Sequence, residues 1–161
     1  MTAAVLTVLL ALCLGACGGK EGERTEQCTI SISCASILEN RALLPAEKEA
    51  LLPEDGWLLK ETAVTFAPGE SVFDVLLRTV REHKIHMEYS DTPVYDSAYI
   101  EGIGNLYEFD CGSGSGWMYR VNGWFPNYGC SRYELKDGDV IELIYTCDLG
   151  ADVGGSAVMG Q

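Results

Sequence analysis

The sequence predicts an α+β domain in which one main helix packs on a mixed β-sheet. Residues 28–34 alternate between apolar and polar side chains, which is typical of a half-buried strand. Residues 72–80 carry an apolar stripe with helical spacing, and several short strand-like segments separated by turn residues follow residue 85. A helix laid across one sheet buries the apolar surfaces of both, so these observations indicate two packed layers.

The first part of the domain is predicted to contain two strands and a short helix. In residues 28–34, the cysteines and isoleucines point to one face and Thr and Ser to the other. A short helix is expected from about Pro45 and must end before Pro53, because proline fits the first helical turn and breaks a helix interior. A second strand is expected over residues 57–66.

The main helix has its own start pattern. Ser71 and Asp74 have the spacing of a capping box, with Asp where Glu or Gln is usual. Behind them Val72, Val75, Leu76, Thr79 and Val80 form one apolar stripe, which predicts a helix of about three turns.

Five further strands are expected after this helix. Turns divide them: a Gly-Asn turn at residues 104–105, an Asn-Gly turn at 122–123 and the polar turn of residues 136–139. Asn and Gly both tolerate a positive φ, so Asn122-Gly123 predicts a tight hairpin. The expected strands are residues 87–89, 98–103, 106–109, 117–121 and 140–145, with residues 90–97 as a loop.

The amino-terminal residues predict export. An uncharged apolar run ends in Leu14-Gly15-Ala16-Cys17, which resembles the lipobox of bacterial lipoproteins. That resemblance implies cleavage before Cys17 and acylation of this cysteine, which anchors the protein at the extracytoplasmic face of the cell membrane. An ordinary secretory signal peptide is the alternative. Residues 1–16 are then a lipoprotein signal peptide, 17–27 a lipidated flexible tether, 28–148 the folded domain and 149–161 a flexible tail.

The charge balance bears on the partners. Eleven Lys and Arg against 24 Asp and Glu give a formal net charge of −13. Such a surface repels phosphate backbones, so nucleic acid is excluded as a partner.

Four segments of the carboxyl-terminal half resemble the transcobalamin-like C-terminal domain, a bacterial domain of unknown function. The segments are residues 68–77, 99–104, 116–123 and 133–142, and the resemblance covers about Thr62 to Thr146. It implies a β-grasp-like fold, similar to the small β-domain that closes over the corrin ring in animal cobalamin carriers. The ligand class that it implies is a corrinoid such as cobalamin, or another flat organic molecule.

The aromatic residues of the predicted hairpin are the candidate ligand contacts. They are Trp117, Tyr119, Trp124, Phe125 and Tyr128. One interpretation is that they pack beneath the helix and along a sheet edge. The other is that Trp124, Phe125 and Tyr128 form an exposed apolar platform at the hairpin tip. A platform suits a flat ligand, or else a surface protein or glycan in a domain without a small-molecule ligand.

Five cysteines remain after Cys13 and Cys17. In an exported protein they are disulfide candidates rather than metal ligands or catalytic thiols. Cys111 and Cys130 flank the hairpin and are expected to pair. Since the first and last strands of a β-grasp sheet lie side by side, Cys147 is expected to reach Cys28 or Cys34, and the choice stays open.

Catalysis and metal binding find little support in the sequence. His83 and His86 are the only histidines, and no further ligands stand at zinc spacing. Asp91, Asp96 and Glu101 lack the spacing of an EF-hand. The chain is therefore predicted to be a non-enzymatic binding protein without a bound metal.

Overall fold

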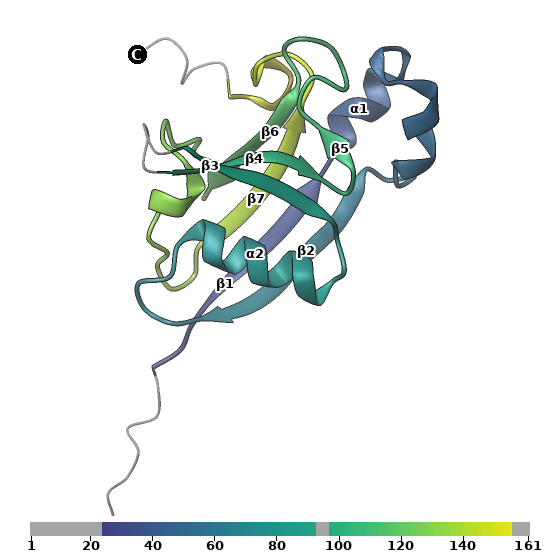
Figure 1. The fold of residues 1–161 in the computed structure, drawn as a ribbon. Coiled ribbons are helices and arrows are strands. Elements are labelled where there is room, and N and C mark those ends of the chain that lie inside the picture. The colour runs from purple at the N-terminus through teal and green to yellow at the C-terminus, as the bar shows by residue number, and fades with distance from the viewer. Residues whose placement is uncertain (1–23, 93–96, 156–161) are drawn as a thin grey trace, which may run out of the picture.

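A computed structural model describes residues 24–92 and 97–155, which form two β-sheets and a few helices (Figure 1). The predicted signal peptide, Cys17 and most of the predicted tether lie outside the described residues. The elements in chain order are β1 (Glu26–Ser33), α1 (Ala35–Glu39), η1 (Arg41–Leu43), η2 (Ala46–Leu51), β2 (Trp57–Phe66), α2 (Val72–Glu82), β3 (Met87–Thr92), β4 (Ser97–Ile103), β5 (Leu106–Tyr107), β6 (Gly116–Val121), η3 (Cys130–Arg132), β7 (Val140–Thr146) and η4 (Ala151–Val153).

The larger sheet is mixed, as the sequence predicts. Its strand order is β2-β1-β7-β6, with β1 and β7 parallel and the two outer pairs antiparallel. The first and last strands of the domain therefore lie side by side, and in Figure 1 β7 runs between β1 and β6.

A second sheet corrects the expectation of a single one. β4 pairs antiparallel with β3 on one side and with β5 on the other, and the three strands form a separate sheet. β5 is shorter than predicted because Phe109 adopts a left-handed conformation, with φ of 67°, that ends the extended run. The strands after residue 85 thus divide between two sheets.

The capping box predicted for the main helix is confirmed. The Asp74 N–H donates to the Ser71 hydroxyl at 3.2 Å, and the Ser71 N–H donates to the Asp74 carboxylate at 2.8 Å. These bonds satisfy two backbone groups at the end that the helix itself leaves unpaired. The predicted apolar stripe of α2 is the buried face.

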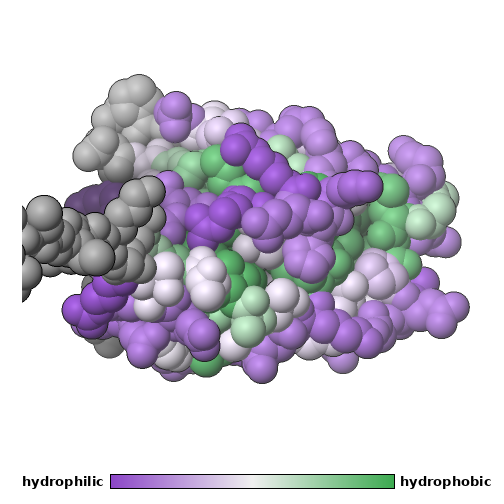
Figure 2. Space-filling model, turned by 90° about the horizontal axis from the view of Figure 1, so that it is seen from below, coloured by the Kyte–Doolittle hydropathy of each residue, from purple (hydrophilic) through white to green (hydrophobic). Residues whose placement is uncertain are grey.

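The main core lies between the large sheet, α2 and the second sheet. Ile30 and Ile141 from the large sheet, Leu76 from α2 and Ile103 from β4 are all fully buried there. A smaller core cluster lies at the carboxyl-terminal ends of β1 and β7 and holds Cys34, Ile37, Leu44, Leu106, Cys111 and Tyr145. The face of the molecule seen in Figure 2 is mostly hydrophilic, as expected for an acidic protein in water.

Two local predictions need correction. The segment after Pro45 is the 3₁₀ helix η2, whose backbone hydrogen bonds span three residues. Residues 149–155, predicted to begin a flexible tail, are folded. There η4 forms, and the Cys147 N–H donates to the Asp152 carboxylate at 2.8 Å.

Candidate functional site

The Asn-Gly turn after β6 forms as predicted, although the hairpin stops after the turn. Asn122 and Gly123 have φ of 52° and 79°. The backbones of Val121 and Trp124 exchange two hydrogen bonds, of 2.9 and 3.0 Å. The Asn122 side chain is engaged as well, since its amide donates to the Asp139 carboxylate at 2.8 Å. Beyond Trp124 the chain forms an irregular loop that leads to η3.

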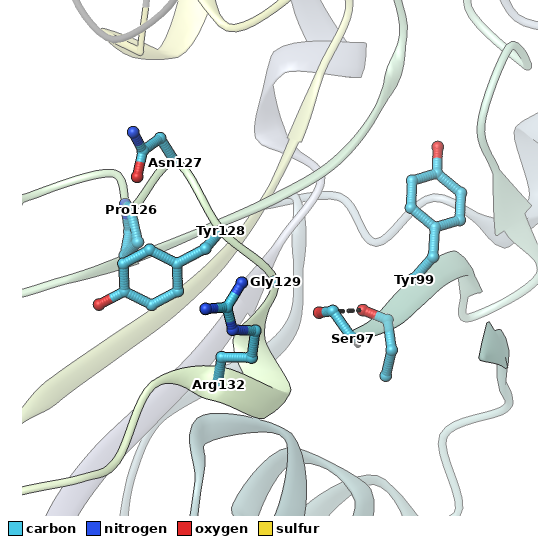
Figure 3. A pocket seen from close by; sticks show the side chains of 8 residues that line it. Ser97, Tyr99, Pro126, Asn127, Tyr128, Gly129 and Arg132 are labelled. Carbon is cyan, nitrogen blue, oxygen red and sulfur yellow. Dashed lines mark hydrogen bonds between the residues drawn. The ribbon is translucent and has the colours of Figure 1, made fainter. Parts of the chain in front are cut away.

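This loop and β4 line an open pocket beside the predicted aromatic residues, with a volume of 610 Å³. We call it the tyrosine pocket. Its lining residues are Ser97, Ala98, Tyr99, Pro126, Asn127, Tyr128, Gly129 and Arg132. Figure 3 shows Tyr99 on one side of the pocket, with Tyr128 and Arg132 together on the other.

A smaller pocket of 110 Å³ continues from the tyrosine pocket toward the large sheet. The two pockets share Ala98, Tyr99 and Gly129, and the smaller one is also lined by Trp117 and Tyr119. Three of the five predicted aromatic residues therefore line one of these two adjacent pockets: Tyr128 lines the tyrosine pocket, and Trp117 and Tyr119 line the smaller one.

Trp117 and Tyr119 are half-buried supports of the smaller pocket. The Trp117 indole N–H donates to the Leu106 carbonyl at 2.8 Å, and its ring meets Tyr145 edge-on at 5.3 Å between centroids. The Tyr119 hydroxyl donates to the Tyr128 carbonyl at 2.8 Å. Both residues thus hold the pocket wall while presenting part of their rings to it.

Trp124 and Tyr128 are exposed, as the platform interpretation predicts. Trp124 is 51% exposed and Tyr128 is 36% exposed, and their rings meet edge-on with centroids 6.2 Å apart. The Arg132 guanidinium lies 5.9 Å from the centroid of the Tyr128 ring, a cation–π arrangement. Two exposed rings beside a pocket offer apolar faces to a planar molecule.

The expectation that Phe125 is exposed is wrong. Only 4% of its surface is exposed, and the Arg120 guanidinium lies 5.8 Å from its ring centroid. The tight turn at residues 122–123 brings the chain back over β6, so the residue after Trp124 turns inward. Phe125 packs as a core residue that anchors the loop.

Close packing at Gly129 and a hydrogen bond accepted by Ser131 hold the loop against β4. A Cβ atom at Gly129 would overlap the Ser97 hydroxyl and would lie 2.7 Å from the Ser97 Cβ. The Ala98 N–H donates to the Ser131 hydroxyl at 2.9 Å. Glycine is needed here because the backbone of the loop approaches β4 too closely for a side chain.

Two phenols beside the tyrosine pocket, those of Tyr99 and Tyr119, have raised pKa values. Burial and a hydrogen bond to the Glu108 carboxylate raise the pKa of Tyr99 to about 12. Burial also raises the pKa of Tyr119. Both phenols therefore stay neutral at pH 7.

The cysteines divide between the two core clusters. Cys28 and Cys130 belong to the main core, and Cys34 and Cys111 to the smaller cluster, against which Cys147 packs. All five are free thiols. The predicted partners Cys111 and Cys130 thus lie in different clusters. Of the two partners considered for Cys147, Cys34 shares its cluster and Cys28 does not.

Sequence reasoning named one residue that lines the tyrosine pocket, Tyr128, and missed the other seven. Tyr99 comes from β4, and Asn127 and Arg132 come from the loop after Trp124, for which the sequence predicted no helix or strand. Pro126 was an available indication of this irregular loop, since proline interrupts a strand.

The parts of the chain that the structure describes contain no group of three or more His, Cys, Asp or Glu arranged to hold a metal ion. Within the same residues, no helix has the length and apolar character required to cross a bilayer.

A comparison with known protein families finds a match for the second half of the chain. Residues 69–146 match the family model described as Domain of unknown function (DUF4430). This range includes nearly all of the four segments that carry the resemblance to the transcobalamin-like domain. No curated protein matches the sequence.

Two solved structures are similar in fold. Haptocorrin in complex with Cbi matches with a TM-score of 0.56 and 15% identity, over 83% of this chain and 28% of the haptocorrin chain. A putative metal binding protein from Ruminococcus gnavus ATCC 29149 matches with a TM-score of 0.44 and 16% identity, over 75% of this chain and 96% of that chain. This protein therefore shares a mixed α/β fold with a little over a quarter of the haptocorrin chain.

Proposed function

We propose that this chain is a ligand-binding protein whose tyrosine pocket takes a flat organic molecule of the corrinoid class. One observation carries the proposal: Trp124 and Tyr128 stand exposed beside a 610 Å³ pocket. Large exposed aromatic side chains next to a hollow are typical of recognition sites.

The chemistry of the pocket suits a planar ring with polar substituents. The faces of Trp124 and Tyr128 supply apolar contact, while Asn127 and Arg132 supply hydrogen-bond donors at the same wall. A corrin ring has this character, because amide groups surround its planar macrocycle.

Two further observations favour the corrinoid class. The haptocorrin structure with a similar fold is a complex with Cbi. The order β2-β1-β7-β6, with parallel strands at the centre and α2 over one face, also agrees with the β-grasp-like fold that the resemblance implies. We therefore include a β-grasp-like fold in the proposal.

The proposal extends to anchoring. Cleavage before Cys17 and acylation of its thiol would hold the domain on the extracytoplasmic face of the membrane. The anchored domain would bind its ligand without catalysing a reaction. Incorporation of a radiolabelled fatty acid into the full-length protein, and its loss in Cys17→Ser, tests this part separately.

Calorimetric titration of the protein with cyanocobalamin and with dicyanocobinamide tests the ligand class. We expect saturable binding, weakened about 3- to 10-fold by Trp124→Ala and by Tyr128→Ala. Trp57→Ala is the matched control. Trp57 is also an exposed tryptophan, but it lines different pockets, together with Ser31 and Glu142.

Absence of binding to both corrinoids at millimolar concentration would reject the corrinoid class. Binding to a glycan array that Trp124→Ala abolishes would then support the alternative function, a surface interaction module. Equal weakening by Trp57→Ala would show that the tyrosine pocket is not the site.

A further inference from the structure

Three cysteines, Cys34, Cys111 and Cys147, lie in or against the smaller core cluster at one end of the large sheet, outside the tyrosine pocket. β1 and β7 are parallel, with Ser33 paired to Ile144, so both strands end at this edge. Cys34 directly follows β1 and Cys147 directly follows β7. The parallel register therefore carries these two cysteines to the same end of the sheet.

The pairing of β6 with β7 places the third cysteine, Cys111, near Cys147. Gly116 at the start of β6 pairs with Thr146 at the end of β7, so the segment just before β6 runs beside Cys147. Two hydrogen bonds fix that segment: the Leu149 N–H donates to the Gly114 carbonyl at 2.8 Å, and the Cys111 N–H donates to the Ser115 hydroxyl at 2.9 Å. Cys111 is thereby held next to Cys147.

The three thiols differ in their access to solvent. Cys34 and Cys111 are fully buried in the smaller core cluster, whereas Cys147 is partly exposed at its margin. The Cys147 thiol lies 3.9 Å from the Ser36 hydroxyl, to which it donates. A reagent from solvent therefore meets Cys147 first.

We propose that Cys111 and Cys147 form a disulfide by exchange with a small disulfide oxidant, with Cys147 as the sulfur that reacts first. This inference is independent of the proposed ligand. It replaces the pairing of Cys111 with Cys130, because Cys130 is buried in the main core with residues of α2.

The exchange balances in two steps. The Cys147 thiolate attacks one sulfur of the oxidant, breaks its S–S bond and releases one thiolate. The Cys111 thiolate then attacks the Cys147 sulfur of the mixed disulfide and releases the second thiolate. The two cysteines lose two electrons and two protons, and the oxidant becomes two thiols.

The environment of the pair favours a structural bond over a reactive thiol. Burial, followed by interaction with Cys147, raises the pKa of Cys111 to about 12, and burial also raises the pKa of Cys147. A buried thiolate is costly, whereas a disulfide carries no charge.

The bond would close a loop of roughly 37 residues that contains β6, the tyrosine-pocket loop and β7. Oxidation with glutathione disulfide at pH 8.5 and mapping of the full-length protein by mass spectrometry test the proposal. The oxidised protein is unfolded in N-ethylmaleimide and digested without reduction. We expect a peptide pair linked through Cys111 and Cys147, with Cys34 and Cys130 alkylated.

Thermal unfolding gives a second readout. Oxidation should raise the Tm of the wild type and of Cys130→Ser by about 10 °C, and should leave Cys147→Ser unchanged. Should Cys147→Ser fail to fold, the peptide map of the wild type decides alone. A link from Cys34 to Cys147 or to Cys111, a link between Cys111 and Cys130, five alkylated thiols or an unchanged wild-type Tm would each overturn the proposal.

Discussion

Gly129→Ala tests the contact between the tyrosine-pocket loop and β4. The backbone at Gly129 has φ of −67° and ψ of 152°, which any residue can adopt, so the effect of alanine is purely steric. The new Cβ would lie 2.7 Å from the Ser97 Cβ and 3.3 Å from the Ala98 carbonyl oxygen. Since ordinary carbon contacts are about 3.5–4.0 Å, the loop must move away by roughly 1 Å.

We expect this overpacking to lower the free energy of unfolding by about 1–3 kcal/mol. At a typical slope of about 2 kcal/mol per M, the midpoint of urea unfolding would fall by roughly 1 M. Corrinoid affinity would fall as well, because the loop carries Tyr128 and Arg132. Gly116→Ala is the matched control. Its Cβ would meet only Glu108, at 3.6 Å, and its stability should stay within about 0.5 kcal/mol of the wild type.

A double-mutant cycle isolates the contact. Ser97→Gly removes the two nearest atoms, so combining it with Gly129→Ala should recover at least about 1 kcal/mol relative to additive effects. A Gly129→Ala protein as stable as the wild type, or strictly additive effects in the cycle, would refute the close packing of the loop on β4.

Three other perturbations give separate outcomes, all measured by urea unfolding. Ser71→Ala removes a side-chain acceptor of the capping box and should cost about 1 kcal/mol, whereas an unchanged midpoint would argue against the cap. Phe125→Ala should cost about 3–5 kcal/mol because the ring is buried, and Trp124→Ala should cost less than about 1 kcal/mol because the indole is exposed; similar costs would contradict their assignment to core and surface. Burial raises the pKa of Cys34 to about 11 and that of Cys130 to about 12. The folded state therefore favours the neutral thiols, and this contribution to the free energy of unfolding is complete below about pH 9 and is lost as the pH rises through the two pKa values. The reduced protein should therefore lose stability between pH 9 and 12, and a flat profile there would contradict the burial of these thiols.

Local patterns predicted the elements that local physics determines. β2 spans Trp57–Phe66, as expected from its strand-forming residues between two turns. The capping box and the Asn-Gly turn also formed, because each depends on hydrogen bonds or φ values within a few residues. A few neighbouring residues are therefore enough to predict the capping box and the turn.

The division into two sheets could not be read in the same way. β6 pairs with β7, about twenty residues later, rather than with the preceding β5. Alternation within a strand shows which face is buried but does not say which strand lies beside it. The prediction of one sheet failed at this long-range choice of partner.

The residues of the candidate site were also difficult to predict where they come from distant parts of the chain. Tyr128 and Trp124 stood out as aromatic residues near a turn, but Tyr99 reaches the pocket from a strand of the other sheet. The cysteines are a sharper case. The sequence pattern puts Cys28 and Cys34 on one face of a strand, but they lie six residues apart, which is about 20 Å along an extended chain, and β1 ends at Ser33. They therefore enter different core clusters, and only the tertiary fold shows that Cys147 joins Cys34 and Cys111.

Backbone amide chemical shifts, recorded by NMR during a titration with dicyanocobinamide, are the most direct test of ligand binding at the tyrosine pocket. We predict saturable shift changes that concentrate in β4 and in the tyrosine-pocket loop, at Tyr99, Tyr128 and Arg132. No change at millimolar ligand, or changes centred on Trp57 and Ser31 at the other pockets, would contradict it.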